Sequence, residues 1–187
     1  MPRLIHLNGP SGVGKSTVAR MYADRHPGVL DLDADQIVSL IGGWQDDFWQ
    51  ALHAGRALAI SMAETHLRGG HDVVMPQLVT RRSEVEGFEA AAARAGAEYR
   101  EIALTIGKQR MVRRFTGRTP STIDEIIAQA GGPVLLERIH DHLTAYLDTR
   151  PNCVQVPTDE CDADETYDAI VAALCANSRR SGRETCR

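Results

Sequence analysis

The chain has 187 residues, of which 43% are apolar and 25% are charged. At about 150 residues per domain, this length predicts one domain, and the composition excludes a disordered chain and a small disulfide-stapled one. The net charge of −4, from 21 basic and 25 acidic residues, disfavours a general binder of nucleic acid or of membrane surfaces.

Short apolar runs alternate with longer helical patterns along the chain, which is typical of βαβ units around a parallel sheet. The predicted strands are residues 4–8, 29–33, 72–76, 98–105 and 154–157. We therefore predict an α/β protein with three layers, α/β/α, and a five-stranded parallel sheet. A single domain is expected over residues 1–177, with a flexible polar tail at 178–187.

Helical patterns fill the segments between these strands. The predicted helices cover residues 15–25, 33–41, 48–68, 83–94 and 162–176, and Ser83 with Glu86 has the spacing of a capping box. Residues 108–150 form the longest stretch without a strand, and two glycine-containing breaks interrupt it. We expect this stretch to be an excursion of two or three helices over the sheet, which would act as a helical lid.

The sequence shows no targeting or membrane-spanning segment. Its first residues, MPRLIHLNG, lack the long apolar run of a signal peptide, and no stretch approaches 18 apolar residues. The expected location is the cytoplasm.

The most informative motif follows the first predicted strand. Residues 9–17 fit G-x-x-x-x-G-K-[ST] and stand between an apolar strand and a helical pattern; they are Gly9, Pro10, Ser11, Gly12, Val13, Gly14, Lys15, Ser16 and Thr17. Glycines let successive backbone N–H groups face phosphate oxygens, and the positive end of the helix adds to this attraction. Lys15 can bridge the β- and γ-phosphates, and the Ser16 hydroxyl can bind Mg²⁺. The motif is unlikely to be accidental, because Lys15 is one of only two lysines.

This loop resembles that of the P-loop nucleotide-binding superfamily. A GTPase is disfavoured because neither lysine follows an asparagine, as the guanine-reading N-K-x-D motif requires. A larger ATPase machine is also disfavoured, since the third strand ends Val-Val-Met-Pro-Gln without the acid of a Walker B strand.

Three acids follow one another at alternate positions where the second strand ends: Asp31, Asp33 and Asp35. Ligands of open α/β sheets bind at the carboxyl ends of strands. Carboxylates beside a bound triphosphate are costly unless Mg²⁺ or a substrate hydroxyl uses them. The alternative is a structural role, with Asp35 as a helix N-cap and Asp31 as a solvated strand end.

The D-x-D pair of Asp33 and Asp35 is similar to that of small P-loop kinases of the shikimate kinase, gluconate kinase and chloramphenicol phosphotransferase type. Polynucleotide 5′-kinases and zeta-type toxins have similar arrangements. The resemblance implies a P-loop kinase fold, with Asp33 on the magnesium side and Asp35 as the base that contacts the acceptor hydroxyl.

Five basic residues occur between Lys108 and Arg118, and Arg110, Arg114 and Arg118 share one face if the segment is helical. Converging guanidiniums can stabilise the charge of a transferred phosphoryl group. The position is similar to the R-x-x-x-R lid of small kinases, which implies a catalytic Arg114 and nucleotide contacts from Arg110 and Arg118. Thr158 stands where those kinases contact adenine. A solvated helix face is the alternative interpretation.

The acceptor is expected to contact the segment after Asp35 and the exit of the third strand. Trp44 and Gln77 are the candidate substrate residues there, although the aromatic cluster of residues 44–49 could equally be core. Arg56 is assigned a structural role by default. The sequence thus predicts an ATP- and Mg²⁺-dependent kinase that phosphorylates a hydroxyl of a small polar molecule, a metabolite or an antibiotic. The alternatives are a polynucleotide 5′-hydroxyl kinase, which the net acidity disfavours, and a nucleotide-dependent switch or ATPase.

Overall fold

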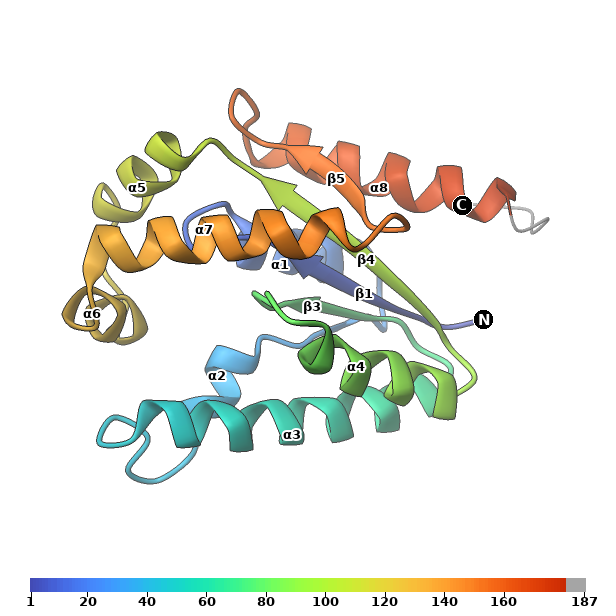
Figure 1. Ribbon diagram of the computed structural model, residues 1–187. Coiled ribbons are helices and arrows are strands. Elements are labelled where there is room, and N and C mark those ends of the chain that lie inside the picture. Colours follow the sequence, from blue (N-terminus) through green and yellow to red (C-terminus); the bar gives the residue numbers. More distant parts are fainter. Residues whose placement is uncertain (181–187) are drawn as a thin grey trace.

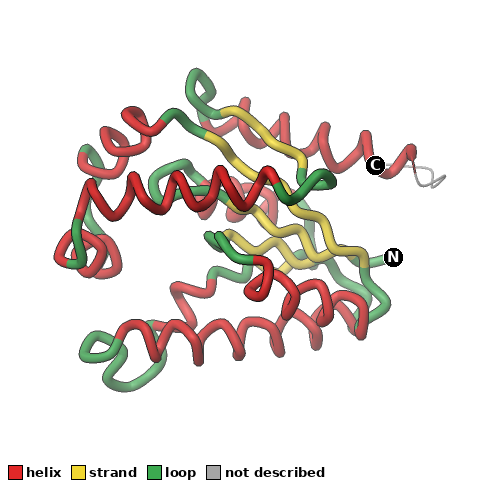
Figure 2. Tube along the Cα trace, viewed as in Figure 1, coloured by secondary structure: helices red, strands yellow, loops and turns green. Residues whose placement is uncertain are grey.

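A computed structural model describes residues 1–180 of the chain. Its centre is one sheet of five parallel strands in the order β2-β3-β1-β4-β5. The strands are β1 (Arg3–Asn8), β2 (Leu30–Asp31), β3 (Val73–Pro76), β4 (Glu98–Thr105) and β5 (Val154–Pro157) (Figures 1 and 2). All five expected strands are present, and the parallel sheet is confirmed.

Helices connect the strands and cover both faces of the sheet. Within the described residues they are α1 (Lys15–Arg25), α2 (Ala34–Val38), α3 (Phe48–Arg68), α4 (Arg82–Arg94), α5 (Lys108–Thr116), α6 (Thr122–Gln129), α7 (Gly132–Asp148) and α8 (Ala163–Arg180). None of these helices is both long enough and apolar enough to cross a membrane.

The alternation of side chains along the strands explains the three layers. In β1, Ile5 and Leu7 belong to the apolar cluster of α1 and α8, whereas Leu4 belongs to the cluster of α2, α3 and α4. Ala103 of β4 faces a third cluster with α4 and α7. Because successive strand residues point to opposite faces, one sheet is covered by helices on both sides, as Figure 1 shows. The predicted three-layer α/β/α architecture is confirmed.

The expected lid segment, residues 108–150, contains α5, α6 and α7. The Ser121 hydroxyl accepts from the Asp124 N–H, and the Asp124 carboxylate accepts from the Ser121 N–H, so a capping box begins α6. Gly131 and Gly132 have positive φ angles of 137° and 51° and separate α6 from α7.

Several predicted boundaries differ from the structure, and the helix expected over residues 33–41 covers only Ala34–Val38. The second strand ends at Asp31 rather than at residue 33, because the Asp33 side chain caps α2. The capping box of Ser83 and Glu86 is wrong: α4 begins at Arg82, and no side chain caps it. The last helix continues to Arg180, into the segment expected as a tail, and residues 181–187 of that segment lie outside the described residues.

Candidate nucleotide and acceptor site

The phosphate loop joins β1 to α1 at the carboxyl edge of the sheet. Gly9, Gly12 and Gly14 have φ angles of 146°, 81° and 101°, which side chains rarely permit. A Cβ atom on Gly9 would also lie 2.6 Å from the Leu104 carbonyl oxygen. The glycines are therefore required by the shape of the loop, and loops of this kind can turn backbone N–H groups toward an anion.

Asn8, the last residue of β1, anchors the loop. Its Oδ1 atom accepts from the Gly9 N–H at 2.8 Å and from the Val79 N–H at 3.0 Å. Its Nδ2 atom donates to the Val79 carbonyl and to Glu101 Oε1, both at 3.0 Å. Asn8 is fully buried, so these contacts fix the start of the loop against the segment that follows β3. The sequence patterns did not single out this residue.

Lys15 folds back over the loop, and its Nζ atom donates to the Pro10 carbonyl at 2.9 Å. Removal of the half-buried ammonium from water lowers the pKa of Lys15 to about 8, while the nearby Asp35 and Asp33 carboxylates oppose this shift. A bound phosphate would favour the charged form. The loop thus holds a lysine whose pKa is lowered by its surroundings.

Asp33 and Asp35 lie at the start of α2, opposite the phosphate loop. Asp33 is the N-cap, and its Oδ1 accepts from the Asp35 N–H at 3.0 Å. Asp33, and not Asp35, is therefore the N-cap of α2, so capping does not occupy the Asp35 carboxylate. Although Asp35 is exposed at the surface, partial desolvation by the surrounding protein and the Asp33 carboxylate raise its pKa. A carboxylate with a raised pKa is a better proton acceptor than an ordinary one.

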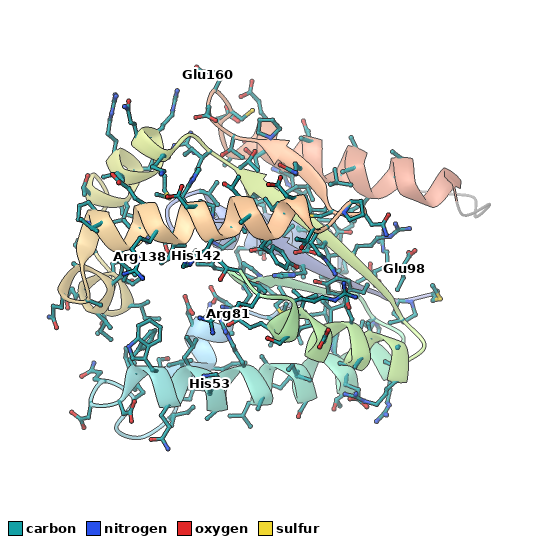
Figure 3. All side chains as sticks on the ribbon, in the orientation of Figure 1. His53, Arg81, Glu98, Arg138, His142 and Glu160 are labelled. Atoms are coloured by element: carbon teal, nitrogen blue, oxygen red, sulfur yellow. The ribbon has the colours of Figure 1, made fainter. Side chains whose placement is uncertain are left out.

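One pocket of about 600 Å³ brings most of the predicted site residues together. Its lining includes the predicted residues Ser11, Gly12, Gly14, Lys15, Ser16, Asp33, Asp35, Trp44, Gln77 and Arg118. We call this space the acceptor pocket. It lies between the loop, the start of α3 and the lid helices α6 and α7. Figure 3 shows the side chains on this side of the sheet, with His53 on α3 and Arg138 and His142 on α7.

Arg56 also lines the acceptor pocket, and its hydrogen bonds are structural contacts, in keeping with the structural role expected from the sequence. Its Nη1 atom donates to Glu84 Oε1 at 2.7 Å, and its Nη2 atom donates to the Leu78 carbonyl at 3.2 Å. Phe48, Leu52 and Arg56 follow one another at a spacing of four residues on α3, so they share one face of the helix. From the sequence alone, that spacing indicates that Arg56 lies on the same face of the helix as Phe48 and Leu52. Arg56 holds the segment after β3 in place.

Arg118 lies beside the phosphate loop at the end of the α5 segment. Its Nη2 atom forms an ion pair with Asp124 Oδ1 of α6 at 2.5 Å, and its charge contributes to the lowered pKa of Lys15. Asp124 is buried and in turn contributes to the raised pKa of Asp35. Arg118 therefore lines the same pocket as Lys15, and its ion pair with Asp124 positions it there. Sequence reasoning missed Asp124 because only the fold brings α6 to the pocket.

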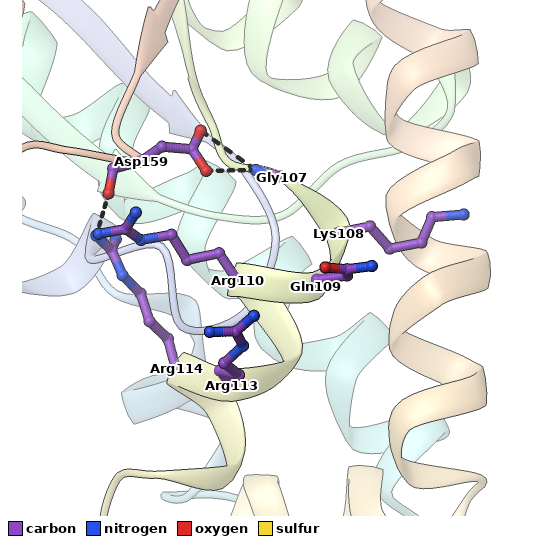
Figure 4. Close-up of a pocket in the computed structure, with 7 residues that line it drawn as sticks. All are labelled: Gly107, Lys108, Gln109, Arg110, Arg113, Arg114 and Asp159. Carbon is purple, nitrogen blue, oxygen red and sulfur yellow. Dashed lines mark hydrogen bonds between the residues drawn. The ribbon is translucent and has the colours of Figure 1, made fainter.

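The other predicted lid arginines line a second pocket, of about 790 Å³, which shares no lining residue with the first. Arg110 pairs with Glu160 at 2.6 Å, and Arg114 donates to the Thr158 carbonyl at 2.9 Å. Figure 4 shows the Asp159 carboxylate accepting from the Gly107 N–H beside them. Thr158 is buried, and its hydroxyl donates to the Thr105 carbonyl. In this arrangement Arg114 contacts the loop after β5.

The residues present fit a magnesium ion that is shared with nucleotide phosphates. Ser16 and Asp33 line the same pocket, and such an ion needs only one or two protein ligands. Within residues 1–180, no group of three histidine, cysteine or carboxylate side chains could hold a metal by itself. A metal at this position would therefore take its other ligands from nucleotide phosphates and water.

Comparisons with known proteins agree with the fold. The model of one protein family, described as an AAA domain, matches residues 4–130. A protein of Chloroflexus aurantiacus assigned as a kinase has 18% identity and a TM-score of 0.68, over 94% of this chain and 97% of that one. The Deinococcus radiodurans tunicamycin resistance protein has 15% identity and a TM-score of 0.60, over 93% and 96%.

A gluconokinase from Sinorhizobium meliloti has 18% identity and a TM-score of 0.58, over 96% of this chain and 95% of that one. At such identities, these likenesses show the fold alone. No curated protein matches the chain in sequence.

Proposed function

We propose that this chain, which belongs to the AAA domain family of P-loop proteins, is a kinase. It would transfer the γ-phosphoryl group of ATP to a hydroxyl of a small molecule. One observation carries the proposal: Lys15 of the phosphate loop and Asp35 of α2 line the same pocket. A phosphate-binding group and a proton acceptor thus face one space that is large enough for an acceptor.

The chain's residues have separate roles in this reaction. The loop N–H groups and Lys15 hold the β- and γ-phosphates, and Ser16 and Asp33 would hold Mg²⁺, which neutralises phosphate charge when bound. The acceptor oxygen forms a bond to the γ-phosphorus, the bond from that phosphorus to the β–γ bridging oxygen breaks, and ADP leaves. The hydroxyl proton passes to the Asp35 carboxylate, whose raised pKa suits it to accept a proton.

The lid completes the proposed site from the other side. Arg118 would stabilise the charge on the phosphoryl group during transfer, and Arg110 and Arg114 would contact the nucleoside end of ATP, while the buried Thr158 holds the loop beside them. The α6 and α7 side chains that line the acceptor pocket would limit the entry of water. Positioning and charge neutralisation would therefore provide most of the rate enhancement.

The charge of the chain favours a small acceptor over a polynucleotide. A polynucleotide kinase needs an extended basic surface to bind its substrate, whereas the net charge of this chain is −4. A nucleotide switch without an acceptor would leave the Asp35 carboxylate and the acceptor pocket without a role.

A screen of hydroxyl compounds for stimulated ADP release tests the proposal. The wild-type protein should release ADP slowly alone and faster with an acceptor, and Lys15→Ala should abolish the stimulation. If no nucleotide binds, or if ADP release in Lys15→Ala equals that of the wild type, this function is rejected.

A further inference from the structure

The acceptor pocket has two chemically different parts. Lys15, Ser16, Asp33 and Asp35 stand at the end beside the phosphate loop. The remaining lining contains polar residues, among them Gln36, Gln77, Thr119 and Thr122, and two groups of apolar side chains from opposite sources, the start of α3 and the lid. The apolar groups are Trp44, Phe48, Trp49 and Leu52 on the α3 side, and Ile123, Ile127, Leu135 and Ile139 on the lid side.

These apolar side chains are incompletely covered by protein. Trp49 is 58% exposed, although it packs edge-to-face on Phe48 with ring centroids 5.2 Å apart. Leu52, Ile123, Ile127, Leu135 and Ile139 are all only half-buried. Apolar surface that remains open to water inside a pocket favours a ligand that covers it with apolar surface of its own. Ile123 of the lid already packs on the cluster that contains Phe48, Trp44 and Leu52, so the two apolar groups meet at that point. An apolar body that entered the pocket beside this contact would be covered by both groups.

The guanidiniums of the pocket already have acidic partners. Arg56 pairs with Glu84 at 2.7 Å, and Arg118 pairs with Asp124 at 2.5 Å. Lys15 is committed to phosphate by its place in the loop. A negatively charged group on the buried part of the acceptor would therefore meet Asp33 and Asp35 without a free guanidinium among the lining residues.

We infer that the acceptor is an uncharged amphipathic alcohol: its hydroxyl faces Asp35, and an apolar body of aromatic size lies between α3 and the lid. This inference rests on the proposed function and narrows it from small molecules in general to hydroxyl compounds with an apolar body. Polyols and sugar acids, which lack such a body, are excluded as preferred acceptors.

Trp44 and Trp49 provide a direct binding test, because they are the chain's only tryptophans and both line the pocket. Intrinsic fluorescence is measured with three matched probes in the presence of a non-hydrolysable ATP analogue and Mg²⁺. The probes are 1-phenyl-1,2-ethanediol, glycerol, which replaces the phenyl ring with a hydroxymethyl group, and mandelate, which replaces the terminal hydroxymethyl group with a carboxylate.

The phenyl diol should change the fluorescence at a concentration at least ~10-fold lower than glycerol does, because its ring is buried on binding. Mandelate should bind more weakly than the diol because its carboxylate meets the acids of the pocket. Equal or tighter binding of glycerol or mandelate would overturn the inference. So would the absence of any fluorescence change with the diol.

Two variants on one helix separate the pocket from the rest of the surface. Leu52→Asn places an amide in the apolar wall and should weaken diol binding ~10-fold or more. Leu58 is 50% exposed and outside the pocket lining, so Leu58→Asn should leave diol binding unchanged. Thermal unfolding of both variants shows whether they fold. Equal diol affinity in a folded Leu52→Asn protein would contradict the inference.

Phosphoryl transfer distinguishes this inference from the function on which it rests. ATP-dependent phosphorylation of polyols in preference to the phenyl diol would leave the kinase proposal intact and refute the amphipathic acceptor. A protein that does not bind ATP would refute the kinase proposal. Diol binding at the two tryptophans can still be measured in that case, because the fluorescence readout does not require turnover.

Discussion

The carboxamide of Asn8 hydrogen-bonds both backbone groups of Val79, donating to the carbonyl and accepting from the N–H, each at 3.0 Å. The side chain thus forms the pair of hydrogen bonds that a backbone residue of an adjacent strand would form. It does so at the end of β1 and beyond the end of β3. Since Asn8 also accepts from the Gly9 N–H, one buried amide joins the first residue of the phosphate loop to the segment that carries Gln77 and Leu78. Asn8 thereby fixes the start of the phosphate loop relative to the segment that follows β3.

Asn8→Ala should therefore reduce both stability and activity. The change leaves buried backbone groups of Gly9 and Val79 without their partner, which costs about 1–3 kcal/mol in the free energy of unfolding. Urea unfolding measures this loss, and Asn152→Ala, at an exposed position, is the matched control. Equal unfolding free energies for the two variants would show that Asn8 does not anchor the loop.

Nucleotide binding should depend on pH through Lys15. Its pKa of about 8 means that the free protein loses this charge above pH 8, whereas bound phosphates favour the charged form. Above that pH, binding must take up a proton, and the Kd for ATP should weaken by up to about tenfold per pH unit. Calorimetry in buffers of different ionisation enthalpy measures the uptake. In Lys15→Arg, which stays charged, the uptake should disappear.

Replacement of Asp35 by asparagine should remove the proton acceptor and preserve the local fold, because Asp33 is the residue that caps α2. The expected result is a decrease in kcat of about 10²–10⁴-fold with unchanged affinity for ATP. The raised pKa also predicts that wild-type kcat/KM falls on the acid side at a higher pH than an ordinary carboxylate would give. A loss of Mg²⁺-dependent ATP affinity in Asp35→Asn would instead assign Asp35 to the metal.

The two lid arginines should affect different kinetic constants. Arg118 lies beside Lys15 in the acceptor pocket, so Arg118→Ala should lower kcat, on the order of 10³-fold if it stabilises the transferred group. Arg114 contacts the Thr158 carbonyl, so Arg114→Ala should mainly raise the KM for ATP. Steady-state kinetics with varied ATP separates the two effects. A kcat loss confined to Arg114→Ala would reverse these roles and restore the arginine assignment expected from the sequence pattern.

A substitution in the loop tests its geometry. Gly12 has a φ of 81°, and a Cβ atom there would lie 3.3 Å from the Phe115 nitrogen of α5. Gly12→Ala should destabilise the protein by about 1–3 kcal/mol and weaken ATP binding, since the loop must rearrange. Gly42→Ala, with open space around it, is the control for unfolding measurements. The prediction fails if both variants unfold alike and bind ATP equally.

Local patterns were sufficient to predict the strands, the phosphate loop and the lid segment. The loop motif of residues 9–17 carries its own strand and helix context, so its place in the fold follows from the sequence. The end of β2 was harder, because aspartate suits both a strand exit and a helix N-cap. Only the bond from the Asp35 N–H to the Asp33 carboxylate shows which of the two acids is the cap.

The partners of charged residues could not be read from the sequence. Arg56 reaches Glu84 across 28 positions, and Arg114 reaches Thr158 across 44. Helical spacing placed Arg114 and Arg118 on one face of a helix, but α5 ends at Thr116, and the two side chains line different pockets. Such contacts depend on how the helices pack on the sheet, which no local pattern contains.

The most direct test of the kinase assignment follows a labelled γ-phosphoryl group. An acceptor that binds at Trp44 and Trp49, identified by fluorescence, is incubated with the protein, Mg²⁺ and ATP carrying ¹⁸O in its γ-phosphoryl group. Mass spectrometry should detect the labelled phosphoryl group on the acceptor with wild-type protein and not with Lys15→Ala. Label that appears only in inorganic phosphate while the acceptor is bound would contradict the account.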